Sequence, residues 1–213
     1  GDAAEGRNVS THVSPSLCPN LGMESSTDKH AGDVRAGDLS GIPKELVEFV
    51  AVVDARPGWE VLEARPSRTC IARDAVDCGS SGAAWRSNHG ELLHDSYFDV
   101  SEMASDAPLW LRLEPVLLRV RCRDLAAAAT LIAAAGVKFR KPGLLEWGVG
   151  ESNECVLEIV GKERLELPLA CPNGTQPLAG HRAWLRHLVN EDLRKSWANL
   201  GAFRDAIQSL SEP

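Results

Sequence analysis

Apolar and polar side chains alternate through residues 113–124, and this pattern predicts a β-strand. Successive side chains of a strand point to opposite faces, so Val120 and Cys122 would face a core. Arg119, Arg121 and Arg123 would share the other face, with neighbours roughly 7 Å apart. Three guanidinium groups repel one another unless anions lie nearby, either carboxylates of the protein or phosphates of a ligand. The residues alone leave both alternatives open.

Shorter apolar or alternating runs predict further strands. They lie at residues 59–62, 69–73, 85–93, 139–147, 155–160 and 165–169.

Apolar residues three to five positions apart predict helices from Pro43 to residue 55, at 125–135 and over 180–210. Asp124 suits the N-cap of the middle helix and Gly136 the position after its last turn. That helix is almost entirely apolar, so we expect it to pack on a sheet. Gly201 is a point at which the last helix could kink or divide. Together these elements predict an α+β fold with a mixed or antiparallel sheet covered by helices.

The first 40 residues differ from the rest of the chain. They are polar, rich in Gly, Ser, Asp and Asn, and show no apolar period. Such a composition predicts an extended or poorly ordered N-terminal arm over residues 1–40. Residues 41–213 have the length and apolar content of one domain.

Composition limits the classes of function. The net charge is −7 and the pI about 5.4, which argues against a general nucleic-acid coat but allows a local basic patch. No apolar run is long enough to span a bilayer, and no secretory signal is visible. The expectation of a cytoplasmic protein, or of one in an organelle, rests on the cysteines and on the family resemblance described below.

The six cysteines form no CxxC pair, and no histidine lies at a zinc-finger spacing from them. We therefore expect no metal site. Cys122 and Cys155 lie within strand-like apolar runs, as buried free thiols do, which favours a reducing compartment. A disulfide between Cys70 and Cys78 stays possible on the sequence.

Three blocks of the chain resemble the tRNA wybutosine-synthesizing protein 3 family. Members of that family read F-x-F-E-P-F-x-L-H-V-x-C-R-x-L, then G-F-R-N-S-G, then L-E-V-P-L. The matching positions are Glu114, Pro115, Leu118, Val120, Cys122, Arg123 and Leu125 in the first block, Phe139, Arg140 and Gly143 in the second, and Leu165, Glu166, Pro168 and Leu169 in the third. The order and the intervals agree as well.

The resemblance implies an S-adenosylmethionine-dependent methyltransferase that acts on a ring nitrogen of a tricyclic guanosine derivative in phenylalanine tRNA. It implies an α+β fold unlike that of the doubly wound Rossmann methyltransferases. In agreement, the chain has no strand followed by G-x-G-x-x-G and a helix. A methyl group on a sulfonium is already activated, so the protein must mainly bind the donor, align the acceptor nitrogen and exclude water.

The chain departs from the family at its polar positions. The family motif S-S-C-S-G-R corresponds to residues 63–68, where Arg68 matches the arginine and little else is kept. The N-S-G element is replaced by Lys141, Pro142 and Gly143, and Arg119 stands where the family has the histidine of L-H-V. This pattern leaves two hypotheses: an active methyltransferase with a remodelled pocket, or an inactive fold that serves as an RNA- or protein-binding scaffold in a ribonucleoprotein assembly.

The resemblance suggests roles for single residues. Those expected at the donor are Ser67, Arg68, Glu114, Gly143 and Glu166. Those expected to bind tRNA are Arg119, Arg121, Arg123, Arg140 and Lys141.

The expected catalytic residues are His89, as a base, and Glu114, as an orienting carboxylate. Simpler roles stay open, namely a surface histidine for His89 and an ion pair for Glu114. Trp85 could stack on a base or lie in the core.

Overall fold

The computed structural model describes residues 42–73, 84–99, 108–140, 142–148, 153–171, 175–176 and 178–210. The strands are β1 (Trp59–Arg65), β2 (Arg68–Arg73), β3 (Ala84–His89), β4 (Leu109–Glu114), β5 (Leu117–Cys122), β6 (Gly143–Trp147), β7 (Cys155–Val160) and β8 (Leu165–Ala170). The helices are α1 (Lys44–Asp54), α2 (Leu125–Ala135) and α3 (Arg182–Gln208), with short 3-10 turns η1 (Asp95–Phe98), η2 (Gly136–Lys138) and η3 (Ala179–His181). The arm expected over residues 1–40 lies outside the described residues.

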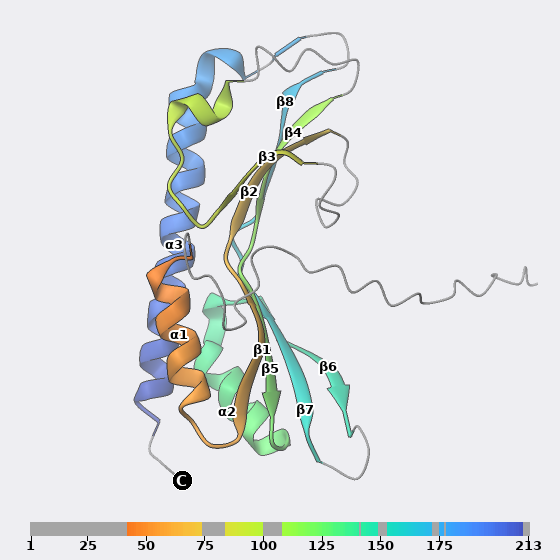
Figure 1. Ribbon diagram of the computed structural model, residues 1–213, viewed down its shortest axis with the longest axis vertical. Coiled ribbons are helices and arrows are strands. Elements are labelled where there is room, and N and C mark those ends of the chain that lie inside the picture. Colours follow the sequence, from red (N-terminus) through yellow and green to blue (C-terminus); the bar gives the residue numbers. More distant parts are fainter. Residues whose placement is uncertain are drawn as a thin grey trace, which may run out of the picture.

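The strands form two four-stranded sheets, and every pairing between them is antiparallel. The lower sheet has the order β1-β5-β7-β6 and the upper sheet the order β3-β2-β4-β8 (Figure 1). The α+β prediction is confirmed. The expected sheet is divided in two, because the chain passes from one sheet to the other between β1 and β2, between β4 and β5, and between β7 and β8.

Proline explains where the strands divide. The single strand expected over residues 113–124 is β4 and β5, which lie in different sheets. Arg65 pairs with Leu117 at the end of the lower ladder, and Arg68 pairs with Glu114 at the end of the upper one. Between these rungs, Pro66 and Pro115 have no N–H to donate, so the ladder stops and both strands bend.

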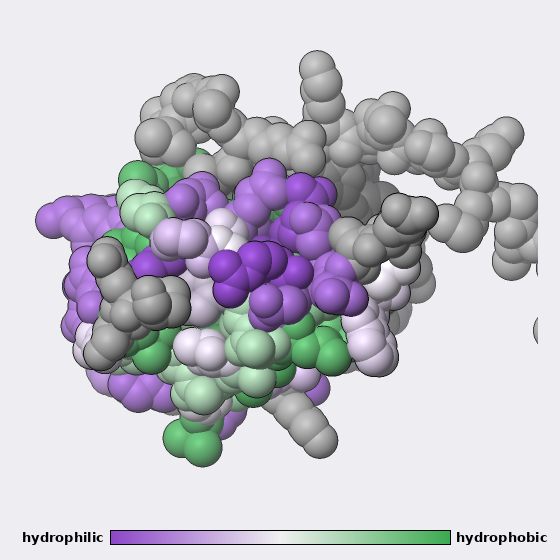
Figure 2. Space-filling model, turned by 90° about the horizontal axis from the view of Figure 1, so that it is seen from below, coloured by the Kyte–Doolittle hydropathy of each residue, from purple (hydrophilic) through white to green (hydrophobic). Residues whose placement is uncertain are grey.

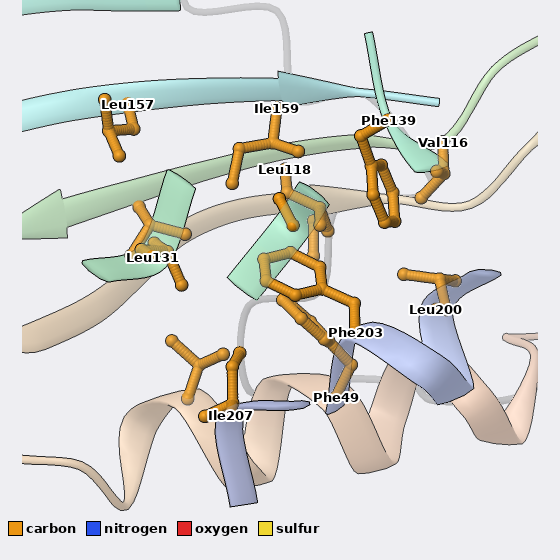
Figure 3. Close-up of a cluster of buried hydrophobic side chains, with 14 of the residues drawn as sticks. Phe49, Val116, Leu118, Leu131, Phe139, Leu157, Ile159, Leu200, Phe203 and Ile207 are labelled. Atoms are coloured by element: carbon orange, nitrogen blue, oxygen red, sulfur yellow. The ribbon is translucent and has the colours of Figure 1, made fainter. Parts of the chain in front are cut away.

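Three helices cover one face of the lower sheet. Phe49 of α1 contacts Phe203 of α3 with ring centroids 4.9 Å apart, and Phe139 lies 5.1 Å from Phe203 on its other side. These rings meet Leu118, Leu157 and Ile159 of the sheet in one buried cluster (Figure 3). Ile71, Leu111, Leu113, Leu185, Val189 and Leu193 belong to a second cluster, between the upper sheet and α3. Among the described residues, no helix packs on the opposite face of either sheet. We call this the outer face.

Helix α3 connects the two halves of the domain. Its 27 residues run beside both sheets without a break, so the division considered at Gly201 does not occur (Figure 1). Arg56 donates from Nη2 to the carbonyl oxygens of Ile207 and Gln208, at 2.8 and 3.0 Å, at the C-terminal end of α3. A cation at this position is favoured by the helix dipole.

The predicted ends of α2 are confirmed. The Asp124 carboxylate accepts the N–H of Ala127 at 2.8 Å, and Gly136 ends the helix with φ of +57°. The strand expected over residues 85–93 ends at His89, because Gly90 turns the chain with φ of +78°. The strand expected over residues 139–147 begins only at Gly143.

Within the described residues, no helix is both long enough and apolar enough to cross a membrane.

Candidate functional site

A row of polar side chains crosses the upper sheet at the bend. Arg68 on β2 pairs with His89 on β3 and with Glu114 on β4, so the three residues share one rung of the sheet. The Arg68 guanidinium donates from Nε to Glu114 Oε2 at 2.8 Å and from Nη2 to Glu114 Oε1 at 3.1 Å. Arg68, Cys70 and Ala72 alternate with Ile71, which contacts α3, so this row lies on the outer face.

The environment of His89 favours a neutral imidazole. Partial burial lowers the pKa of His89 below its ordinary value of 6.5, and the positive charge of Arg68 lowers it further, whereas Glu114 raises it. A neutral imidazole at pH 7 can accept a proton. The expected base and the expected carboxylate are thus brought together, with Arg68 between them.

The other residues expected at the donor lie in different surroundings. Glu166 pairs with Arg112 across β4 and β8, at 2.9 Å. Ser67 is buried, and its hydroxyl shares a 2.8 Å hydrogen bond with Ser196 of α3, on the side of the sheet opposite to the outer face. Gly143 is exposed at the start of β6 in the lower sheet.

The arginines of β5 lie on the outer face, as the alternation predicts. Arg119 lies between two carboxylates: its Nη1 donates to Glu63 at 2.7 Å, and its Nη2 donates to Glu158 at 3.0 Å. Arg121 donates to Glu60 at 2.5 Å. Carboxylates of the protein therefore compensate these guanidinium groups.

The three other residues expected to bind tRNA lie apart from this ladder. Arg123 is exposed and donates to Asp124 at 3.1 Å. Arg140 is exposed, and its backbone N–H donates to the Val160 carbonyl at 2.8 Å. Lys141 lies outside the described residues. Binding of tRNA by these residues stays a prediction.

A pocket of about 440 Å³ opens on the outer face of the lower sheet. This volume is within the range of small-molecule sites. The pocket is lined by Leu62, Glu63, Arg119, Arg121, Leu145, Glu146, Glu154, Cys155 and Val156. Apart from the two arginines, and from Cys155, which was expected to be a buried thiol, the sequence analysis did not single out these positions.

Two β-bulges explain why apolar side chains reach this pocket. The pairing of β1 with β5 shifts between Val61 and Glu63, and that of β6 with β7 shifts between Leu144 and Glu146. The extra residues are Leu62 and Leu145, and both line the pocket. Bulges redirect single side chains in this way and often occur beside functional sites.

The thiols of the lower sheet are not suited to catalysis. Cys122 and Cys155 are paired across β5 and β7 and are buried. Burial, and to a smaller extent Cys155, raises the pKa of Cys122 to about 12, and burial also raises the pKa of Cys155. Cys70 is buried, and Cys78 lies outside the described residues. In the described part of the chain, no three His, Cys, Asp or Glu side chains are grouped so that they could hold a metal ion.

Asn190 has a structural role that the sequence analysis did not identify. Its side chain is buried on α3, accepts the N–H of Leu93 at 2.7 Å and donates to the carbonyl of Leu93 at 3.0 Å. This pair of hydrogen bonds holds the segment after β3, and with it the position of His89, against α3.

The surface at the lower end of the molecule is divided. Hydrophilic residues gather in the middle of this end, with hydrophobic residues below them (Figure 2). The exposed large apolar residues include Leu125 and Ile132 of α2 and Leu144, Leu145 and Trp147 of β6. The side chain of Trp147 is 64% exposed.

Comparison with known proteins identifies the family. The sequence pattern described as Methyltransferase TYW3 matches residues 78–209. The chain belongs to the TYW3 methyltransferase family. Membership of the TYW3 family implies a methyl donor and favours an enzyme over an inactive scaffold.

Two curated relatives agree with this assignment. The chain is 26% identical over 189 residues to the tRNA(Phe) 7-((3-amino-3-carboxypropyl)-4-demethylwyosine(37)-N(4))-methyltransferase of Archaeoglobus fulgidus, a match that spans 86% of this chain and 91% of that protein. It is 34% identical over 127 residues to the tRNA wybutosine-synthesizing protein 2/3/4 of Oryza sativa subsp. japonica. That match spans 56% of this chain but only 11% of the rice protein, which is much longer.

Solved structures share the fold of this TYW3 family member. A hypothetical protein from Aeropyrum pernix has a TM-score of 0.68 at 17% identity, and the match covers 80% of this chain and all of that one. The PH1069 protein from Pyrococcus horikoshii has a TM-score of 0.66 at 14% identity, with 79% and 87% of the chains covered.

Proposed function

We propose that this protein is an S-adenosylmethionine-dependent N-methyltransferase that acts on a wybutosine precursor in phenylalanine tRNA. The observation that carries the proposal is the match to the Archaeoglobus fulgidus methyltransferase, which extends over 86% of this chain and 91% of that enzyme. A shared domain alone would leave the activity to other parts of a longer protein, but here the match covers nearly the whole relative.

The reaction moves the methyl group from the donor sulfur to a nitrogen of the tricyclic base. The sulfonium becomes a thioether, the new N–CH₃ bond forms, and the nitrogen loses a proton. The chain must hold both partners in line, since alignment supplies much of the rate enhancement of such a transfer.

The row at the bend provides groups for this chemistry. His89 is the proposed acceptor of the proton, because burial and Arg68 lower its pKa and keep the imidazole neutral near pH 7. Glu114 is the proposed orienting carboxylate, and Arg68 fixes its direction through two hydrogen bonds. Arg68, Glu114 and Glu166, which share the outer face of the upper sheet, remain our proposed donor-binding residues. Ser67 faces α3 and Gly143 lies in the lower sheet, so the structure does not bring these two to the same site.

A transfer assay tests the proposal. Purified protein is incubated with S-adenosylmethionine labelled in the methyl group and with tRNA(Phe) from cells that cannot complete wybutosine. We expect label in the tRNA and a mass increase of one methyl group on the modified base. Unmodified tRNA(Phe) is the control substrate. Stable binding of the tRNA without methyl transfer would contradict the enzyme and support a scaffold.

A further inference from the structure

Arg119 and Arg121 differ in the positions of the carboxylates beside them. Arg119 has a carboxylate on each side, from Glu63 on β1, which also pairs with Arg65, and from Glu158 on β7. Arg121 has the Glu60 carboxylate on the β1 side only, because Val156 is its cross-strand neighbour on β7. A carboxylate placed over Val156 would give Arg121 the second partner that Arg119 already has.

The same pocket contains carboxylates that the protein does not pair. Among the described residues, neither Glu146 nor Glu154 has an ion-pair partner. Glu146 lies on the far side of Val156 from Arg121, since Val156 pairs with both residues. The lining thus has three carboxylates, with Glu63, against two guanidinium groups. This balance disfavours a phosphate and favours a ligand that brings both signs of charge.

Apolar side chains form the remaining part of the lining. Leu62 and Leu145 come from the two bulges, on the edge strands β1 and β6. Val156 lies between Arg121 and Glu146. A ligand with an aliphatic segment next to its charged end would cover these three side chains.

From these contacts we propose that the pocket binds an α-amino-acid group, an ammonium and a carboxylate on one carbon, attached to a short aliphatic chain. Arg121 binds the carboxylate over Val156. Glu146 and Glu154 bind the ammonium, and Leu62 and Leu145 contact the methylene groups. The ion pairs of Arg119 with Glu63 and Glu158 fix the wall of the pocket.

The proposal rests on the proposed function, because both partners of that reaction can supply this group. S-adenosylmethionine carries it in its methionine part. The acceptor of the Archaeoglobus fulgidus relative carries it as a 3-amino-3-carboxypropyl group, as the name of that enzyme states. The two sources share one recognition chemistry, and binding experiments can separate them.

The first experiment uses the full chain and the amino-acid group alone. L-methionine is titrated into ¹⁵N-labelled protein, and the Arg side-chain Nε–H resonances are followed by NMR. We expect the Arg121 resonance to shift in a saturable way, and D-lactate, which has no ammonium, to have a much weaker effect. The wild-type protein suffices for this measurement, so it decides the matter even if a pocket variant fails to fold.

The second experiment identifies the source of the group. Calorimetry measures S-adenosylhomocysteine and 5′-methylthioadenosine, which lacks the amino-acid part, on wild type, Arg121→Ala and Glu154→Gln. Arg194→Ala and Glu191→Gln, at exposed positions of α3, are the matched controls. If the group belongs to the donor, the pocket variants weaken S-adenosylhomocysteine by roughly tenfold or more and leave 5′-methylthioadenosine unchanged.

If the group belongs to the acceptor, S-adenosylhomocysteine binding is unchanged in the pocket variants. Wild type then prefers tRNA that carries the aminocarboxypropyl group over tRNA that lacks it, and Arg121→Ala loses this preference. No response of Arg121 to L-methionine, together with unchanged binding of all these ligands in the variants, would overturn the proposal. If methyl transfer is nevertheless observed, only the pocket assignment fails. If Arg121 responds but no methyl is transferred, only the proposed activity fails.

Discussion

Arg68 and Glu114 are cross-strand partners at the last rung of the upper sheet, and the guanidinium donates to both carboxylate oxygens, at 2.8 and 3.1 Å. The rung lies directly beside the bend between the sheets. The pair therefore holds together the end of the upper sheet at which β2 and β4 meet the bend. It also orients Glu114 beside His89.

A double-mutant cycle measures this pair. Arg68→Ala and Glu114→Ala, alone and together, are compared in urea unfolding. We expect a coupling free energy of about 1 kcal/mol, because both side chains are only partly buried. Arg68 has further interactions, so the single variant should cost more than the coupling. Additive single effects would show that the pair is energetically neutral.

The pH dependence of stability tests the environment of His89. Its folded-state pKa is lowered, so the unfolded chain binds more protons as the pH falls below about 6.5. The contribution of His89 to stability is therefore present above pH 6.5 and is lost as the pH falls through the lower, folded-state pKa. In urea unfolding from pH 7.5 to pH 5, wild type should lose more stability than His89→Gln. Equal losses would mean that the histidine is not shielded in the fold.

Gly90 and Gly201 form a matched pair of glycine substitutions. A Cβ at Gly90 would lie 2.3 and 2.7 Å from Cγ and Cδ of Pro43, and the φ of +78° disfavours any other residue. We expect Gly90→Ala to destabilise the protein by more than about 1 kcal/mol, since both steric overlap and backbone strain act.

Gly201 is the opposite case. It lies within α3, and a Cβ there would meet nothing within 4 Å. Gly201→Ala should stabilise the protein by about 0.5–1 kcal/mol, the difference in helix propensity. Thermal unfolding of both variants checks the two signs. Stabilisation by alanine at position 90 would contradict the close packing of that turn on Pro43.

Removal of the Asn190 side chain should destabilise the fold. Asn190→Ala leaves the N–H and the carbonyl of the buried Leu93 without their partners, which should cost about 1–3 kcal/mol. Gln208→Ala, at an exposed position of the same helix, is the control and should change stability by less than about 0.5 kcal/mol. Methyl transfer should fall with Asn190→Ala even under conditions in which the variant is folded, because the segment that positions His89 is released.

The salt dependence of tRNA binding separates the arginines. Each lost phosphate contact should lower the slope of log K against log salt by about 1. Arg123→Ala and Arg140→Ala remove exposed charges and should each have this effect, whereas Arg119→Ala removes a guanidinium held by two carboxylates and should leave the slope unchanged. A lower slope for Arg119→Ala alone would show that phosphate displaces its protein partners.

Local features of the fold were predictable, and features that depend on distant segments were not. The N-cap at Asp124 and the end of α2 at Gly136 follow from residues next to the helix, and both are confirmed. Neither end of α2 depends on how distant strands pair. The family motifs likewise lie within short blocks of the chain.

The partners of Arg119 show the opposite situation. Glu63 is 56 residues away in the chain and Glu158 is 39 residues away, so only the pairing of β1, β5 and β7 brings them together. The bulges at Leu62 and Leu145 also arise from how two strands pair, and no pattern within either strand marks them. The pocket could therefore not be predicted from the sequence, although its two arginines had been singled out there.

The unbroken course of α3 has a mechanical consequence. A helix of 27 residues is about 40 Å long, and this one is anchored to the upper sheet through Leu185 and to the lower sheet through Phe203. A change in the angle between the two sheets at the proline bend would require α3 to bend or to lose its contacts with one of the sheets. The distance between His89 on the upper sheet and the charged pocket on the lower sheet is therefore fixed. A substrate that contacts both must be long enough to span that distance.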